Sequence, residues 1–126
     1  MKFGANTWIW FAPFTFEELN ETAARMAEAG FDIIELPIET IDAYDYHKAA
    51  EIVRNYGLDV TVAAAMAPGR DLIHPDENMR ETGLTYIRHC IEATKTLGAT
   101  NLIGAFYSSV GRTWHSTAEE RARDLD

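Results

Sequence analysis

A repeated helix–glycine–strand pattern is the feature that most limits the possible folds of this chain. Gly30, Gly57 and Gly98 each follow a segment with helical spacing of apolar residues, and each precedes an apolar, strand-like run. Glycine commonly ends a helix in the left-handed conformation because it has no Cβ atom. Strands that alternate with helices in this way pair in parallel through right-handed crossovers. The pattern therefore predicts an α/β protein built from repeated βα units.

The predicted elements alternate along the whole chain. Strands are expected over 2–7, 31–36, 59–65 and 101–106, and helices over 46–56, over 75–97 and from a first capping pair at Thr15 and Glu18. The strands are nearly continuous apolar runs, as is typical of strands that are covered on both faces. The order βαβαβαβ(α) predicts the N-terminal half of a parallel (βα)8 barrel, the TIM barrel, with residues 1–126 as a single domain.

A second capping pair, Ser116 and Glu119, predicts that a fourth helix begins just before the sequence ends at Asp126. Four strands cannot close a barrel, so two strand edges and part of the core would stay open, and open edges favour association. We therefore expect this chain either to be the front half of a longer barrel or to pair with a second copy. A doubly wound sheet is the structural alternative, and it would require a fifth strand or a phosphate-binding loop.

Charge and cysteine content limit the classes of partner. The net charge of the 126 residues is -9, which argues against a nucleic-acid partner and against an anionic membrane surface. The single cysteine, Cys90, cannot form an intrachain disulfide, and this fits a reducing compartment. We therefore expect a cytoplasmic protein.

The loops that follow the strands contain most of the residues that could bind a ligand. In parallel α/β folds, ligands bind at the carboxyl ends of the strands. The first of these loops contains Trp8, Trp10, Phe11 and Phe14. Such rings either stack on the C–H faces of a sugar or plug the barrel mouth, and the sequence leaves both interpretations open.

Two charged residues near these loops also have two interpretations. Glu35, expected at the end of the second strand, either accepts hydrogen bonds from a polyol or pairs with an arginine or with backbone N–H groups. Arg70 either reaches a ligand or, with Asp71, shapes its own loop. The four histidines do not form a set with the three protein ligands that a catalytic zinc ion requires. The histidines therefore do not indicate a zinc site.

Four segments of the chain resemble a known family: MKFGANTWIW, AGFDIIELPIE, APGRDLIHPDENMRETGLTYIRHCIEATKTLGA and LIGAFYSSVG. They are similar to the N-terminal half of the xylose isomerase-like sugar epimerases and isomerases, in particular the ketose 3-epimerases that act on D-tagatose and D-allulose. The resemblance implies a full-length enzyme of about twice this length. It also implies a divalent metal ion (Mn, Mg or Co) and proton transfer at C3 of a ketose through an enediolate. In that family the metal ligands, which include the glutamates that move the proton, lie in the second half, so the resemblance implies no catalytic residue and no metal ligand in this chain.

The resemblance implies that this half supplies the walls of the substrate pocket. Together with the loop analysis it gives the substrate-binding candidates Asn6, Trp8, Trp10, Phe14, Glu35, Ala64, Phe106, Tyr107 and Trp114. Asn6 and Ala64 differ from the bulkier side chains that well-known relatives have there, so we expect a different pocket around the far end of the sugar. Another isomerase of the superfamily, of the inosose or hydroxypyruvate type, is the alternative. A non-catalytic half-barrel that serves as a binding or assembly module is the second alternative.

Overall fold

The computed structural model describes residues 1–111 and 116–125. It contains four strands, one short 3-10 helix and four α-helices in the predicted alternating order. In chain order they are β1 (Gly4–Asn6), η1 (Thr7–Ile9), α1 (Phe16–Glu28), β2 (Ile33–Ile38), α2 (Tyr46–Asn55), β3 (Asp59–Ala65), α3 (Glu77–Thr96), β4 (Leu102–Ala105) and α4 (Ala118–Leu125). No helix within the described ranges is both long enough and apolar enough to cross a bilayer.

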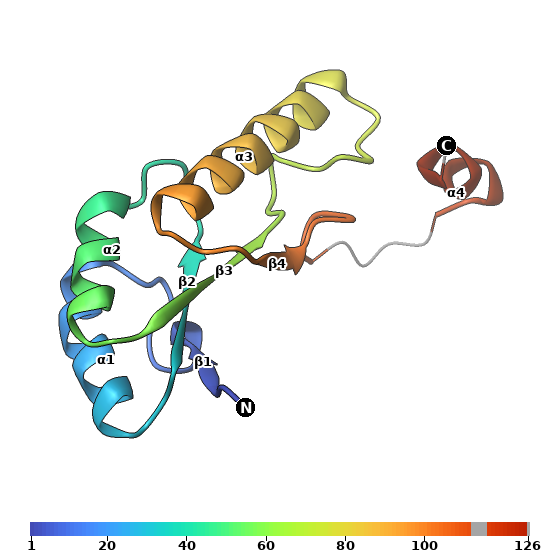
Figure 1. Ribbon diagram of the computed structural model, residues 1–126. Coiled ribbons are helices and arrows are strands. Elements are labelled where there is room, and N and C mark those ends of the chain that lie inside the picture. The colour runs from blue at the N-terminus through green and yellow to red at the C-terminus, as the bar shows by residue number, and fades with distance from the viewer. Residues whose placement is uncertain (112–115, 126) are drawn as a thin grey trace.

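The four strands form one parallel sheet in the order β1-β2-β3-β4. Helices α1, α2 and α3 lie on the same side of this sheet, as Figure 1 shows. A doubly wound sheet reverses its strand order and carries helices on both faces, so that alternative is wrong. A sequential parallel sheet with helices on its outer side is half of a (βα)8 barrel, which confirms the predicted fold class.

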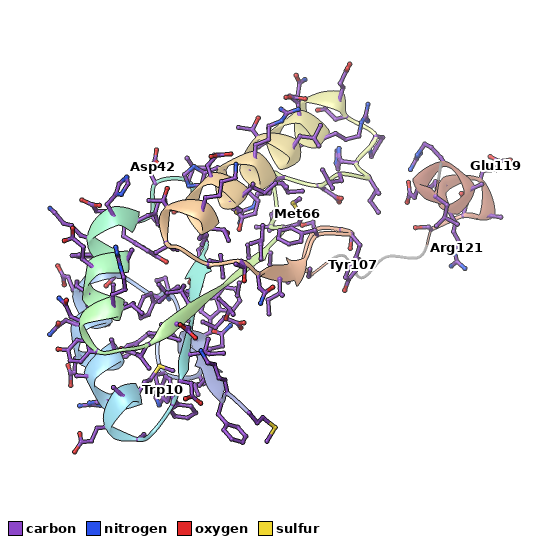
Figure 2. All side chains as sticks on the ribbon, in the orientation of Figure 1. Trp10, Asp42, Met66, Tyr107, Glu119 and Arg121 are labelled. Carbon is purple, nitrogen blue, oxygen red and sulfur yellow. The ribbon has the colours of Figure 1, made fainter. Side chains whose placement is uncertain are left out.

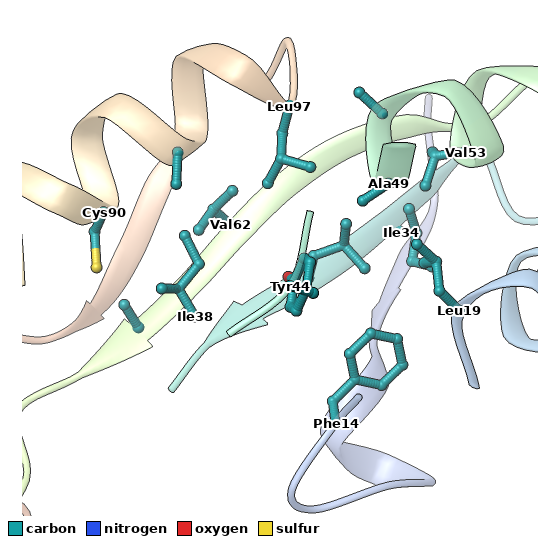
Figure 3. Close-up of a cluster of buried hydrophobic side chains, with 14 of the residues drawn as sticks. Phe14, Leu19, Ile34, Ile38, Tyr44, Ala49, Val53, Val62, Cys90 and Leu97 are labelled. Carbon is teal, nitrogen blue, oxygen red and sulfur yellow. The ribbon is translucent and has the colours of Figure 1, made fainter. Parts of the chain in front are cut away.

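The hydrophobic core lies between the outer face of the sheet and the helices (Figure 3). Alternate strand residues such as Ile34 and Val62 are fully buried there, against Leu19, Val53 and Leu97 of the helices and their ends. Because successive side chains of a strand point to opposite faces, the residues between them face the inner side of the half-barrel. This alternation decides which predicted site residues are available to a ligand.

Several predicted helix ends are confirmed and two are shifted. The Thr15–Glu18 capping box is formed, and Gly30, Gly57 and Gly98 all have positive φ angles. Helix α3 begins at Glu77, two residues later than predicted, because the side chain of Asp76 accepts a hydrogen bond from the backbone N–H of Asn78 at 2.9 Å.

The cap of α4 is the second shifted end. Thr117 and Glu120 form the reciprocal pair there, one residue beyond the predicted Ser116 and Glu119. The backbone N–H of Glu120 donates to Thr117 Oγ1 at 3.1 Å, and the N–H of Thr117 donates to Glu120 Oε2 at 2.8 Å. None of the residues of α4 is buried.

Three strands differ from their predicted ranges, and β4 is shorter by one residue at each end. Strand β1 has three residues, and β2 begins at Ile33 and extends to Ile38, whereas β3 has the predicted limits. Asp32, the residue before β2, is held against the start of the first strand segment, because its side chain accepts a hydrogen bond from the backbone N–H of Phe3 at 2.8 Å. Because β2 extends to Ile38, Glu35 lies in the interior of β2 and not at its end.

Candidate functional site

A row of polar side chains crosses the inner face of three strands. Asn6, Glu35 and Thr61 are register partners in β1, β2 and β3. The Asn6 amide donates to Glu35 Oε1 at 2.6 Å, and the Thr61 hydroxyl donates to Glu35 Oε2 at 3.2 Å. Glu35 is thus paired with two neutral side chains, and among residues 1–111 and 116–125 the expected arginine or backbone N–H partner is replaced by Asn6 and Thr61. A charged acceptor flanked by two neutral polar groups suits a hydroxylated ligand inside the barrel.

An open groove of about 460 Å³ lies at the carboxyl end of the sheet. Its walls include Trp8, Glu39, Met66, Arg70 and Val110, which come from the loops after all four strands. The Trp8 indole donates its Nε1–H to Glu39 Oε1 at 2.7 Å, and the backbone N–H of Trp8 donates to Asn6 Oδ1 at 2.7 Å. These two hydrogen bonds hold the Trp8 indole beside the polar row, on the wall of the groove.

Three consecutive carbonyl groups at the end of β2 are held by three side chains. The Tyr44 hydroxyl donates to the Pro37 carbonyl at 2.9 Å, the Tyr86 hydroxyl donates to the Ile38 carbonyl, and Arg70 Nη2 donates to the Glu39 carbonyl at 2.7 Å. Pro37 and Ile38 lie beyond the last β1–β2 register pair, and Glu39 lies beyond the last β2–β3 pair, so these carbonyls are free to accept from side chains. Two of the three donors, Tyr86 of α3 and Arg70 of the loop after β3, come from outside the loop that follows β2.

The tyrosine hydroxyls of this rim make the fold sensitive to alkali. Burial, more than any neighbouring charge, raises the pKa of Tyr44 and Tyr86 above the ordinary value of 10.0. The folded state keeps these protons to a higher pH than the unfolded chain, so the stability is complete below pH 10 and falls as the pH rises beyond it.

We therefore expect a lower free energy of unfolding at about pH 11 than at about pH 8, with a smaller pH effect in Tyr44→Phe and Tyr86→Phe. Urea titrations at both pH values measure this. Tyr107→Phe is the control, because the Tyr107 side chain is 79% exposed. An unchanged pH effect in both buried variants would contradict the prediction.

The predicted aromatic residues of the first loop do not gather at one site. Phe14 is 5% exposed and belongs to the helix-facing core, where its ring meets Tyr44 edge-on at a centroid distance of 6.4 Å. Trp10 is 48% exposed and lines a separate groove of about 220 Å³ with Met26 of α1 and Phe31. Phe31 precedes the amino end of β2, so this groove is remote from the carboxyl-end site; Figure 2 shows Trp10 and Met66 at opposite ends of the sheet.

The remaining candidates divide in the same way. Ala64 is 1% exposed in the helix-facing core, because it follows Val62 by two residues, and Phe106 packs against that core. Tyr107 is exposed beyond the end of β4, and Trp114 lies outside the described residues. The structure thus brings together Asn6, Trp8 and Glu35 of the predicted set.

Sequence reasoning missed Thr61, Glu39 and the role of Tyr86. Thr61 needed the strand register, which the sequence does not state. Glu39 lay in the right loop but had no predicted partner. Gly83 of α3 lies against the loop after β3, where an added Cβ would be 3.1 Å from Leu72 Cδ2.

The acidic, histidine and cysteine side chains decide whether a metal ion could bind here. Within residues 1–111 and 116–125, no three His, Cys, Asp or Glu side chains lie close enough to hold one metal ion. The Glu35 carboxylate is already shared between Asn6 and Thr61. The described residues therefore do not fit a metal centre.

This protein is half of a (βα)8 barrel, because its parallel sheet is sequential and carries helices on its outer side. Its candidate ligand site lies on the inner face of the sheet, at the carboxyl ends of the strands. The chain belongs to the xylose isomerase-like TIM barrel family, whose sequence model matches residues 23–125. This finding confirms the resemblance noted in the sequence.

Curated relatives and solved structures agree with that assignment. The chain is 24% identical over 110 residues to a ketose 3-epimerase of Arthrobacter globiformis, covering 87% of this chain and 38% of the relative. It matches an L-ribulose 3-epimerase of Mesorhizobium japonicum at the same identity, over 37% of that relative. A D-allulose 3-epimerase structure from Methylomonas sp. superimposes with a TM-score of 0.87 at 20% identity, over 99% of this chain and 44% of that one. The chain thus spans less than half the length of these proteins.

Proposed function

We propose that this chain forms the substrate-binding half of a sugar isomerase that epimerises a ketose at C3. The observation that carries the proposal is the polar row of Asn6, Glu35 and Thr61 on the inner face, next to Trp8, in a chain of this family. Hydroxyl groups of a sugar need both acceptors and donors, and the row offers both. An indole face at the same edge suits the C–H face of a sugar ring or chain.

The chemistry of C3 epimerisation requires a base and a group that stabilises negative charge. A proton leaves the carbon next to the carbonyl, and a proton returned to the opposite face inverts that carbon. Glu35 is not available for the first role, because its carboxylate is held by Asn6 and Thr61. We therefore place the catalytic carboxylates, and the divalent metal ion (Mn, Mg or Co) implied by the resemblance, outside this half.

The candidate residues have different roles in this proposal. Asn6, Glu35 and Trp8 contact the sugar directly, and Tyr107 is available to it at the end of β4. Phe14, Ala64 and Phe106 act from the core by supporting the strands and loops. Trp10 lines a groove away from the sugar site, and Trp114 stays a prediction from the resemblance.

The two edge strands of the sheet, β1 and β4, must be paired for the site to be complete. We propose that the partner is either the C-terminal half of a longer barrel or a second copy of this chain. Strands β1 and β4 are the two ends of the strand order, so each has one edge open to a further strand. Ile103 of β4 is 50% exposed on the inner face, where a partner would cover it. A cytoplasmic location stays a prediction from the single cysteine.

A turnover assay tests the proposal. The protein expressed from the whole reading frame that encodes residues 1–126 is expected to interconvert ketoses epimeric at C3 when Mn²⁺ is supplied. D-allulose and L-ribulose are the first substrates to test, because structural neighbours are named for them. Residues 1–126 alone are expected to bind without turnover.

The assay also separates the alternatives. Conversion of inosose or hydroxypyruvate, with no ketose epimerisation, would favour another isomerase of the superfamily. Turnover of a ketose by residues 1–126 alone would show that the catalytic groups are wrongly placed here. Binding with no turnover of any of these compounds by the whole protein would favour a non-catalytic module.

A further inference from the structure

We propose that Arg70 is a positioning residue that fixes the Trp8 indole at the mouth of the sugar site, acting through Glu39. Its consequence for sugar binding rests on the proposed function, but the structural link itself does not. The link has three steps, from Tyr86 to Arg70, from Arg70 to Glu39 and from Glu39 to Trp8. It joins the loops after β1, β2 and β3 at one point.

The Arg70 guanidinium holds two strand ends together. Its Nη2 donates to the Glu39 carbonyl after β2 at 2.7 Å and to the Ala65 carbonyl at the end of β3 at 3.0 Å. Its Cζ lies 3.6 Å above the centroid of the Tyr86 ring. A planar guanidinium makes both kinds of contact at once, whereas a compact lysine ammonium cannot reproduce the stacked, forked geometry.

The Nε–H group of Arg70 shows that the guanidinium is not simply a charged group in solvent. Its Nε–H is buried and has no hydrogen-bond partner within residues 1–111 and 116–125. Leaving a buried donor unpaired is unfavourable, so the two carbonyl contacts and the stacking on Tyr86 must offset it. The guanidinium is therefore held by the rim and is not available as a ligand-binding group.

Glu39 transmits the position of Arg70 to the first loop. Its backbone carbonyl is held by Arg70, while its Oε1 accepts hydrogen bonds from Trp8 Nε1 at 2.7 Å and from the backbone N–H of Phe14 at 3.2 Å. Hydrogen bonds to a carboxylate are stronger and shorter than those between neutral groups. A shift of the Glu39 backbone therefore moves the acceptor that orients the Trp8 indole.

The indole N–H signals of ¹⁵N-tryptophan-labelled protein test this link directly. The chain has three tryptophans, and Trp8→Phe assigns the Trp8 signal by its loss. Arg70→Met and Glu39→Ala are each expected to move the Trp8 signal upfield, towards that of a solvent-exposed indole, and to leave the other two unchanged. Glu39→Gln keeps an oxygen acceptor and is expected to preserve the signal. Arg88→Met is the control, because Arg88 lies on α3 beside Tyr86 in sequence but pairs with Glu81 at the surface.

The result that overturns the proposal is an unchanged Trp8 signal in Arg70→Met. If that variant does not fold, Arg70→Lys and Glu39→Ala measure the same link, and unchanged Trp8 signals in both overturn it as well. In a protein that turns over a ketose, Arg70→Met is expected to raise KM by about tenfold with a much smaller change in kcat. Absence of any ketose turnover would instead count against the proposed function, while the indole signals would still decide the role of Arg70.

Discussion

Gly104→Ala is expected to destroy the stable fold. Gly104 lies in β4 opposite Ala64 of β3. Its φ is 155°, a backbone conformation that residues other than glycine rarely adopt. A Cβ atom at this position would lie 1.6 Å from the Ala64 carbonyl oxygen and 2.7 Å from its carbonyl carbon. Backbone atoms of a central strand cannot move aside without breaking the β3–β4 pairing. We expect a loss of more than about 4 kcal/mol, which is most of the stability of an ordinary domain.

Urea unfolding followed by circular dichroism measures this loss. Gly98→Ala is the matched control, because Gly98 also has a positive φ of 75° but has nothing within 4 Å of an added Cβ. That variant carries the backbone cost alone, about 1–2 kcal/mol. If both alanine variants lose the same stability, the steric argument for Gly104 is wrong.

Glu35→Ala is expected to have the second largest effect, about 2–3 kcal/mol of unfolding free energy. The substitution removes the acceptor that Asn6 and Thr61 share and leaves two half-buried polar groups without their partner. Glu35→Gln is expected to lose less than about 1 kcal/mol, because its amide oxygen accepts from Asn6 while its NH2 group donates to the Thr61 hydroxyl.

Thermal or urea unfolding of both variants provides the comparison. Asp32 and Glu39 stay unchanged in both, so the loops at each end of β2 are not altered. Equal stability of Glu35→Ala and the parent protein would mean that the polar row does not contribute to the fold. A large loss in Glu35→Gln as well would show that the negative charge, and not the hydrogen-bond geometry, holds the row.

Local rules were enough to predict the elements of the fold. The capping pair at Thr15, the glycines after the helices and the apolar runs all depend on neighbouring residues, and these predictions are confirmed. The parallel alternation then allowed few topologies. The helix starts that were wrong are at Pro75, where Asp76 caps a helix that begins two residues further on, and at Ser116, where the adjacent Thr117 caps the helix instead.

The candidate site was less predictable because it depends on contacts between distant residues. The Arg70 side chain bonds to a carbonyl 31 residues earlier, and Tyr86 bonds to one 48 residues earlier. Such contacts require the strand register and the packing of α3, neither of which a local pattern reports. Phe14 and Ala64 were predicted as pocket residues because their positions along the chain suited it, but strand alternation and ring packing turn them to the core.

The secured end of β2 has a consequence for redesigning this protein. Residue 39 is tied to Arg70, and Asp45 caps α2 by accepting from the Lys48 N–H at 3.1 Å, whereas residues 40–43 between these anchors are exposed. Extra residues placed after Thr40 would enter a segment whose two ends are held independently. A lid or a peptide tag grafted there would lie beside the groove at the carboxyl end of the sheet, because Thr40 is one of the residues that line it.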